Sequence, residues 1–283
     1  MTEDATQKFL ESLPRIKPGE SFWFACHPDV PCFNACCSDL TMPLTPYDVL
    51  RLCQGLDMGS EQFFEDFARV GCYEDTGFPL LHLRMEDAPG KPCPFVTEQG
   101  CGVYEHRSSA CRTYPLGRAS CRAERAGNGE NAGEAAGTGP IEIEERYFLV
   151  REDHCKGFEQ NRQWTTDTWL ADQGLEPYCR VVVRYMRLIC RFNGVANGAI
   201  LSGKHATMAL LCLYQQDRFL EFLQSVGMFS RVSITGEYNG LTGREAVELV
   251  LRDPEQRLWF AFDWLELMLF GASDTLTPVA AGA

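Results

Sequence analysis

Residues Phe24–Cys37 read FACHPDVPCFNACC, a stretch in which four cysteines fall within a dozen positions and two of them are adjacent. The four are Cys26, Cys32, Cys36 and Cys37. Thiols gathered in this way can bind a metal, form disulfides or pack as small hydrophobic side chains. The chemistry of this stretch therefore decides what kind of domain surrounds it.

The composition of the chain favours metal chemistry over disulfides. A chain of 283 residues is long enough to build a core without disulfides. Its first twenty residues, MTEDATQKFLESLPRIKPGE, are acidic and polar and lack the apolar run of a secretory signal, so we expect a cytoplasmic protein. In a reducing compartment, clustered cysteines point to metal or redox chemistry.

The net charge of −13 argues against binding to nucleic acid or to an anionic membrane surface. The most apolar window, residues 257–271, is too short to cross a bilayer and contains Asp263 and Glu266. It predicts a buried helix. The partners that we expect are therefore a metal ion and, as an alternative left open, another protein.

Eight of the fourteen cysteines lie in or beside loop-rich sequence, where turn residues such as Pro31, Pro92 and Gly100 surround them. These eight are the candidate metal ligands: Cys26, Cys32, Cys36, Cys37, Cys93, Cys101, Cys111 and Cys155. Four others fall on apolar helical stripes and are interpreted as core residues: Cys53, Cys179, Cys190 and Cys212. The sequence leaves Cys72 and Cys121 undecided.

Two helices are predicted between the early cluster and Cys93. Thr45 followed by Pro46, with Asp48 at the third helical position, is a start signal for the first. The second begins at Ser60 and buries Phe63, Phe64 and Phe67. Short strands and turns are expected over residues 80–114, and the alternation of residues 141–152 predicts a further strand.

The fold class predicted is α+β: a loop-rich cysteine-cluster metal-binding domain with short strands and helices, followed by an α-helical region. The domain boundaries are 1–160 and 161–283. Residues 123–140 are rich in Gly and Ala and predict a mobile surface insertion. From Thr165 onward the patterns are helical, including one helix from Pro177 to a stop at Asn193–Gly194 and another over residues 203–227.

The ordered motifs resemble a known family. C-x5-C-x3-C-C from Cys26 is followed by CPF at Cys93, GCGVYEHR at residues 100–107, CRTYP at residues 111–115 and CKG at Cys155. Together they resemble the YkgJ-type cysteine-cluster family, described as a zinc- or iron-chelating domain with eight characteristic cysteines. The resemblance covers roughly the first 160 residues and implies that the eight cysteines named above are the metal ligands.

The spacing of the cysteines does not distinguish zinc from iron. Eight thiolates can complete two zinc sites or ligate an iron–sulfur cluster. Alternatively, some of them form one metal site and the remaining thiols are free for redox chemistry. Among the basic residues near the ligands, Arg112 is the preferred candidate to offset the negative charge of bound thiolates. His27 and His154 each neighbour a candidate ligand and are retained as alternates.

Three functions remain open from the sequence. The first is a metal-binding protein that chelates zinc or iron for structure, storage or sensing. The second is an iron–sulfur redox or methyl-transfer enzyme, because flagellin lysine methylase shows a similar cysteine cluster. The third is an interaction scaffold with a structural metal site, in which the basic stripe Arg180, Arg184, Arg187 and Arg191 meets an acidic partner. Whether the chain is an enzyme stays undecided.

The adjacency of Cys36 and Cys37 predicts how the thiols divide. Consecutive side chains generally point to different sides of the chain, so one pair of neighbours serves two centres more easily than one. We therefore expect two nearby centres or one polynuclear cluster, completed by Cys93, Cys101, Cys111 and Cys155.

Overall fold

The computed structural model describes residues 14–17, 19–123, 141–196 and 198–279. The chain forms two compact units, and each is built from two separate stretches. The first unit comprises Met1–Pro43 and Leu83–Arg187, and the second comprises Leu44–His82 and Leu188–Ala283. These units group residues differently from the boundary at residue 160, which stays a prediction about separately folding domains. The predicted α+β class is confirmed by helices and short antiparallel strands in both units.

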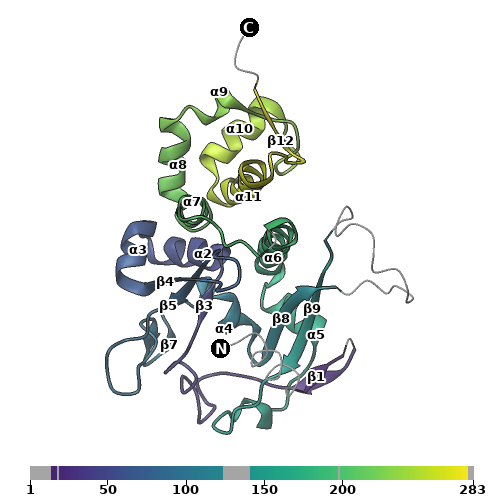
Figure 1. The fold of residues 1–283 in the computed structure, drawn as a ribbon. Helices are drawn as coiled ribbons and strands as arrows, with labels where there is room; N and C mark the ends of the chain where they lie inside the picture. Colours follow the sequence, from purple (N-terminus) through teal and green to yellow (C-terminus); the bar gives the residue numbers. More distant parts are fainter. Residues whose placement is uncertain (1–13, 18, 124–140, 197, 280–283) are drawn as a thin grey trace, which may run out of the picture. The chain divides into compact units, whose positions relative to one another are not determined.

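The largest sheet of the first unit is a three-stranded antiparallel sheet in the order β1-β9-β8. Strands β8 (Leu116–Arg122) and β9 (Ile143–Leu149) pair from Leu116–Leu149 to Arg122–Ile143, and β1 (Arg15–Ile16) pairs with the other side of β9 (Figure 1). The strand predicted within residues 141–152 is thus present. Apart from Ala123, the predicted insertion at residues 123–140 lies outside the described residues.

An aromatic core anchors the segments on either side of the cysteine loops. Strands β2 (Ser21–Trp23) and β10 (Gln163–Thr165) pair antiparallel, and the core beside them contains Phe22, Phe24, Leu116, Trp164 and Trp169. Indole N–H groups fix its geometry: Trp164 donates to the carbonyl of Phe24 at 2.9 Å, and Trp169 donates to that of Thr113 at 3.0 Å. The chain therefore enters the loop at Cys26 from a rigid, buried position.

Two short helices and one long helix follow the later cysteines. Helix α4 (Ser109–Thr113) is capped by the Ser108 hydroxyl, α5 is Thr166–Asp172, and α6 is Glu176–Ala196. The predicted stop at Asn193–Gly194 is wrong, because α6 continues to Ala196. A glycine inside a helix costs only about 1 kcal/mol relative to alanine, and the earlier turns of α6, which bury residues such as Leu188, outweigh that cost.

The predicted basic stripe on α6 is partly neutralised within the chain. Arg180 lies 3.6 Å from Glu176, and Arg191 lies 3.8 Å from Glu266 and stacks over the ring of Phe270. An acidic partner for this stripe stays a prediction.

The start of the second unit follows its sequence signals. Helix α2 (Pro46–Leu56) begins with a capping box, in which Thr45 and Asp48 bond reciprocally. Helix α3 (Ser60–Phe67) completely buries Phe63, whereas Phe64 and Phe67, also predicted to be buried, are only half-buried. They accompany a three-stranded sheet in the order β3-β5-β4, formed by Pro43–Leu44, Pro79–Leu83 and Ala68–Cys72.

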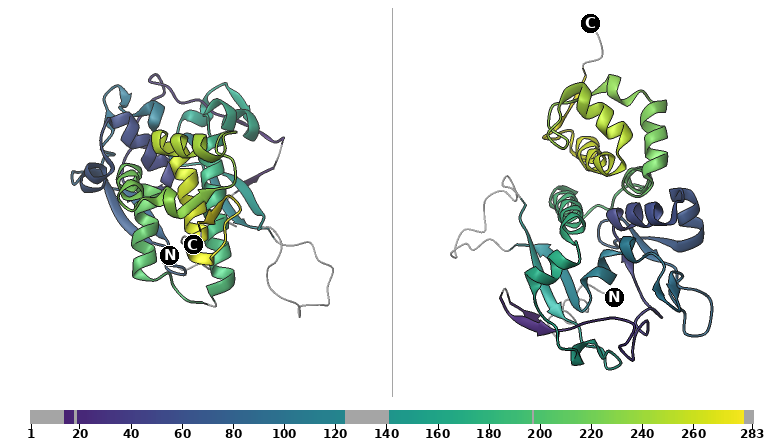
Figure 2. Two further views of the ribbon diagram at one scale, coloured as in Figure 1. Left: turned by 90° about the horizontal axis from the view of Figure 1, so that it is seen from above. Right: turned by 180° about the vertical axis from the view of Figure 1, so that it is seen from behind.

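The rest of the second unit is mainly helical (Figure 2). Its helices are α7 (Gly203–Tyr214), α8 (Gln216–Ser225), α9 (Met228–Arg231), α10 (Gly243–Arg252) and α11 (Pro254–Phe270). The single helix predicted over residues 203–227 is wrong, since the backbone breaks at Gln215. Strands β11 (Val232–Ile234) and β12 (Leu276–Pro278) form a small sheet that the helical patterns did not predict.

The apolar window of residues 257–271 forms most of α11, and it is buried as predicted: Leu258, Phe260, Ala261, Phe262 and Leu265 have no exposed surface. Among the described residues, no helix combines the length and apolarity needed to span a membrane.

Candidate metal centre

All eight candidate ligands lie in the first unit, and they come from four parts of the chain. Cys26, Cys32, Cys36 and Cys37 share the early loop, Cys93 and Cys101 flank a hairpin, Cys111 lies on α4, and Cys155 follows β9. All fourteen cysteines of the chain are free thiols. The disulfide alternative raised by the opening stretch therefore has no support in the structure.

The early loop is a series of tight turns. Backbone amides of Val30, Phe33 and Ala35 each donate to the carbonyl three residues earlier, and Cys37 donates to Asn34 at 2.9 Å. Asn34 adopts the left-handed conformation, with φ of 67°, which asparagine tolerates better than most residues. The consecutive turns curl the chain so that its cysteines stay close together.

A hairpin carrying two later cysteines is joined to this loop. Strands β6 (Val96–Thr97) and β7 (Gly100–Cys101) pair antiparallel. The side chain of Asn34 donates to the carbonyl of Thr97 at 3.0 Å. Gly100 has φ of 123°, and a Cβ there would lie 3.2 Å from the ring of Phe33, so glycine permits this close approach.

Cys155 reaches the same loop from the other side. The backbone amide of Lys156 donates to the sulfur of Cys32 at 3.0 Å, and Ala25 donates to the carbonyl of Gly157 at 3.1 Å. Gly157 is required here, since a Cβ at this position would lie 2.5 Å from the ring of Phe24. These contacts place the CKG segment against the first cysteines of the chain.

The eight thiols form one connected group, which we describe as two sets of four that share contacts through Cys36. Cys26 interacts with Cys32, Cys36 and Cys155, and we call these four the first thiol set. Cys37 interacts with Cys93 and Cys111, and Cys111 with Cys93 and Cys101, and we call these four the second thiol set. Cys36 also interacts with the second set, so the two sets adjoin at Cys36 and Cys37.

The adjacent thiols of Cys36 and Cys37 interact with each other. This interaction lowers the pKa of Cys36 to about 7 and raises the pKa of Cys37. That these two thiols serve different centres stays a prediction.

Four of the other candidates, Cys26, Cys93, Cys101 and Cys111, are neutral thiols at neutral pH. Burial, together with the nearby thiols, raises the pKa of Cys26 to about 11 and that of Cys111 to about 12. Cys111 keeps some exposed surface although protein surrounds its sulfur closely. Burial also raises the pKa of Cys93 and Cys101. A metal that binds here must displace protons.

Two buried arginines lie beside the second thiol set. Arg107 donates to the carbonyl of Tyr104 at 2.5 Å and to the side chain of Gln173 at 2.6 Å. Arg112 donates to the carbonyls of Glu105 and Gln173 at 2.5 and 2.8 Å. It also contacts the Arg107 carbonyl and the Tyr178 hydroxyl, each at 3.1 Å. Both residues are only 9% exposed.

Sequence reasoning identified Arg112 but missed two neighbours of the ligands. The thioether of Met42 lies 3.9 Å from the sulfur of Cys111 and accepts a hydrogen bond from the Ser108 hydroxyl at 3.1 Å. Arg107 was grouped with the other nearby basic residues. No motif marks a lone methionine, whereas the burial of Arg107 depends on α5 and α6, which lie far along the sequence.

The histidine alternates are partly exposed and each faces a carboxylate. His27 lies 3.6 Å from Asp29, and His154 lies 3.6 Å from Glu152. His154 and Glu152 also interact with Cys36. A ligand role for either histidine stays a prediction.

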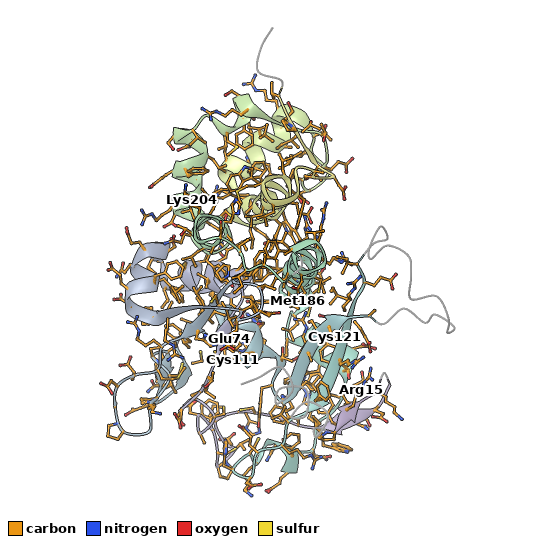
Figure 3. The ribbon with its side chains drawn as sticks, in the orientation of Figure 1. Arg15, Glu74, Cys111, Cys121, Met186 and Lys204 are labelled. Carbon is orange, nitrogen blue, oxygen red and sulfur yellow. The ribbon has the colours of Figure 1, made fainter. Side chains whose placement is uncertain are left out.

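Of the six remaining cysteines, Cys121 and Cys179 belong to the same unit as the thiol sets, and the other four, which include the half-buried Cys190, belong to the second unit. Figure 3 labels Cys111 and Cys121, which lie on α4 and β8, and the thiol of Cys121 faces the carbonyl of Glu144 at 3.9 Å. Cys212 is fully buried, as predicted, and Cys53 is half-buried. Cys179 is not in apolar surroundings, because it contacts Arg118, Glu145 and Tyr147. Cys72 is exposed on β4.

The donor set fits a metal by its chemistry. Among the described residues, no three His, Cys, Asp or Glu side chains are arranged to hold a metal ion as they stand. The buried hydroxyl of Tyr114, however, forms no hydrogen bond of standard geometry and faces the thiol of Cys155. It is therefore placed to donate to a sulfur that has lost its proton. Thiolates in sets of four are ligands for zinc and for iron.

Residues 25–156 match the family model CxxCxxCC, described as a putative zinc- or iron-chelating domain. This match confirms the resemblance predicted from the cysteine motifs, and it spans all eight candidate ligands. It supports metal binding of the zinc or iron class for this part of the chain. No curated protein and no solved structure matches the chain.

Proposed function

We propose that the protein is a metal chelator in which eight cysteines hold two adjacent centres of four thiolates each. Cys26, Cys32, Cys36 and Cys155 form one centre, and Cys37, Cys93, Cys101 and Cys111 form the other. The observation that carries this proposal is a pair of hydrogen bonds that join the cysteine loops: the amide of Cys93 donates to the carbonyl of Cys37 at 2.8 Å, and the amide of Lys156 donates to the sulfur of Cys32 at 3.0 Å.

In each centre the four cysteines would hold the metal as thiolates. Zinc or iron supplies a Lewis acid that displaces the thiol protons, and an iron–sulfur cluster would add one-electron chemistry. The backbone amide of Lys156 stabilises the Cys32 sulfur by donating to it, and Tyr114 is placed to do the same for Cys155. Arg107 and Arg112 supply positive charge beside Cys101 and Cys111.

Metal analysis and a visible spectrum of the anaerobically purified chain test this function. Two metal ions per chain are expected. A colourless sample containing two zinc ions supports structural or storage chelation, whereas a broad absorption band with iron and acid-labile sulfide supports the redox or methyl-transfer enzyme. A single mononuclear metal, or a chain that binds none after reconstitution, contradicts the proposal.

Single Cys→Ser variants of each set locate the centres. Cys26→Ser and Cys101→Ser should each lower the stoichiometry from two metals to one. Cys72→Ser is the matched control, because Cys72 is an exposed thiol outside both sets. If either ligand variant retained two metals, or if the control lost one, the assignment of the two centres would be wrong.

A further inference from the structure

Arg107 and Arg112 are buried cations without an acidic partner. Every hydrogen bond of Arg112 goes to a neutral group, and so do those of Arg107. In the part of the chain that the structure describes, neither guanidinium lies within ion-pair distance of a carboxylate. The two charges also repel each other. Burying two such like charges costs free energy unless an anion lies nearby.

Arg107 lies beside the second thiol set, whose cysteines would carry negative charge as thiolates around a metal. Cys101 and Cys111 both interact favourably with Arg107, and Cys111 directly precedes Arg112 in α4. Four thiolates around a divalent ion carry a net charge of −2, which two guanidiniums balance. Metal binding to this set therefore offsets the free-energy cost of burying the two guanidiniums, and the two guanidiniums in turn favour metal binding.

Charges of both signs lie beside the first thiol set. Glu152 interacts unfavourably with Cys36 and His154 interacts favourably, and about half of each of these side chains is exposed. Lys156 directs its side chain to Glu159 at 3.1 Å. These charges oppose each other and are screened by solvent, so they do little to retain an anionic centre.

We propose that the two centres are unequal: Arg107 and Arg112 retain the metal of the Cys37–Cys93–Cys101–Cys111 centre, while the metal of the Cys26–Cys32–Cys36–Cys155 centre exchanges. This inference rests on the proposed function. The second centre is thus the structural one, and the first is the one through which zinc is taken up or passed on.

Zinc release from the full chain loaded with two zinc ions tests this inequality. The loaded protein is mixed with an excess of a chromogenic chelator, and release is followed over time. Two kinetic phases of one zinc each are expected. Cys26→Ser should abolish the fast phase, and Cys101→Ser should abolish the slow phase. The opposite assignment, or a single phase for two bound zinc ions, overturns the proposal.

Substitution of Arg107 separates its charge from its hydrogen bonds. Arg107→Gln removes the charge and should accelerate the slow phase about 10- to 100-fold, the usual effect of losing a group that supports metal ligands. Arg107→Lys keeps the charge and should release zinc close to the original rate. Arg162→Gln is the control, because Arg162 is an exposed arginine of the same unit and should change neither phase.

The outcomes distinguish the inference from the function on which it rests. Equal acceleration by Arg107→Lys and Arg107→Gln would show that hydrogen bonding and not charge retains the metal, and the inference would be wrong. Acceleration of both phases together would also overturn it. In either case two bound zinc ions would leave the proposed function intact, whereas loading with fewer than two would contradict that function itself. Circular dichroism of each loaded variant verifies that it is folded.

Discussion

The backbone amide of Cys93 donates a hydrogen bond to the carbonyl of Cys37 at 2.8 Å, which joins two cysteine loops that lie far apart in the sequence. Ser38 and Pro92 form a bridge directly beside it. The second thiol set is therefore brought together by main-chain bonds as well as by side chains. This hydrogen bond forms only when both loops are folded. We therefore expect metal binding by the second thiol set to be coupled to the folding of both loops.

Loss of the two adjacent cysteines should unfold the cysteine-bearing part of the chain. In Cys36→Ser/Cys37→Ser, both centres lose a ligand, and the loops have little apolar burial of their own to replace the free energy of metal binding, which reaches about 10 kcal/mol or more for structural zinc. Hydrogen exchange should accelerate over residues 26–43 and 91–111. Helix α11, whose core residues are fully buried, should stay protected.

Chelation of the loaded wild-type chain should reproduce the pattern seen in the double variant. Cys179→Ser serves as its control, because that thiol lies outside both sets. If the double variant had the same melting temperature and circular dichroism as the wild type, the expected coupling of metal binding to folding would be wrong.

The segment 124–140 should be dispensable for metal binding. All eight candidate ligands lie outside it, and β8 and β9 are paired from Leu116–Leu149 to Arg122–Ile143 without it. Replacing residues 124–141 with a two-residue Asn-Gly turn keeps Ala123 opposite Glu142 and should preserve both this pairing and the metal content. Reduced metal content in the deletion, measured against the full-length chain purified in parallel, would show that the segment orders the site.

Local signals in the sequence predicted several elements correctly because the interactions that form them are local. The Thr45–Asp48 capping box, the start of α3 at Ser60 and the buried window in α11 each depend on residues within a few positions of one another. The cysteine motifs likewise predicted the match to the model of a zinc- or iron-chelating domain, because each motif is a short run of neighbouring residues.

Features that depend on distant residues could not be predicted. The contact between Cys93 and Cys37 and the burial of Arg107 against Gln173 join segments that share no sequence pattern. One helix end was also misplaced: α6 continues past Gly194 to Ala196, although Asn193, Gly194 and Val195 are exposed. The polar surroundings of Cys179 come from β8 and β9, which no periodicity within α6 reveals.

Cys212→Ala should leave metal binding unchanged and lower stability modestly. The side chain is fully buried on α7, far along the chain from any ligand, and its thiol contacts only the carbonyl of Ala209 at 3.7 Å. Removing one sulfur leaves a small cavity, which costs about 1 kcal/mol. Urea unfolding measures that cost, and metal analysis should still find two ions. Loss of a metal would place Cys212 among the ligands and contradict its assignment to the core.

Asp217 should stabilise the second unit in a pH-dependent way. Its carboxylate, at the start of α8, accepts hydrogen bonds from the amide of Ser60 at 2.9 Å and from the Ser60 hydroxyl, which caps the beginning of α3. Burial opposes ionisation of Asp217, but these bonds hold its pKa below the ordinary value of 3.8. Because the folded-state pKa is lowered, the contribution is present above pH 4 and disappears as the pH falls through the folded-state pKa.

Asp217→Ala should therefore destabilise the protein at pH 7 by about 1 kcal/mol, the usual cost of losing a helix cap, with solvent screening at this exposed residue limiting any larger effect. The difference between the variant and the wild type should shrink below pH 4, where the wild-type carboxylate becomes protonated. Denaturant unfolding at a series of pH values measures this difference. Glu221→Ala is the control, because Glu221 lies on the same helix and caps nothing. A wild-type advantage that stayed constant from pH 7 to pH 3 would show that the charge of Asp217 contributes nothing to the cap.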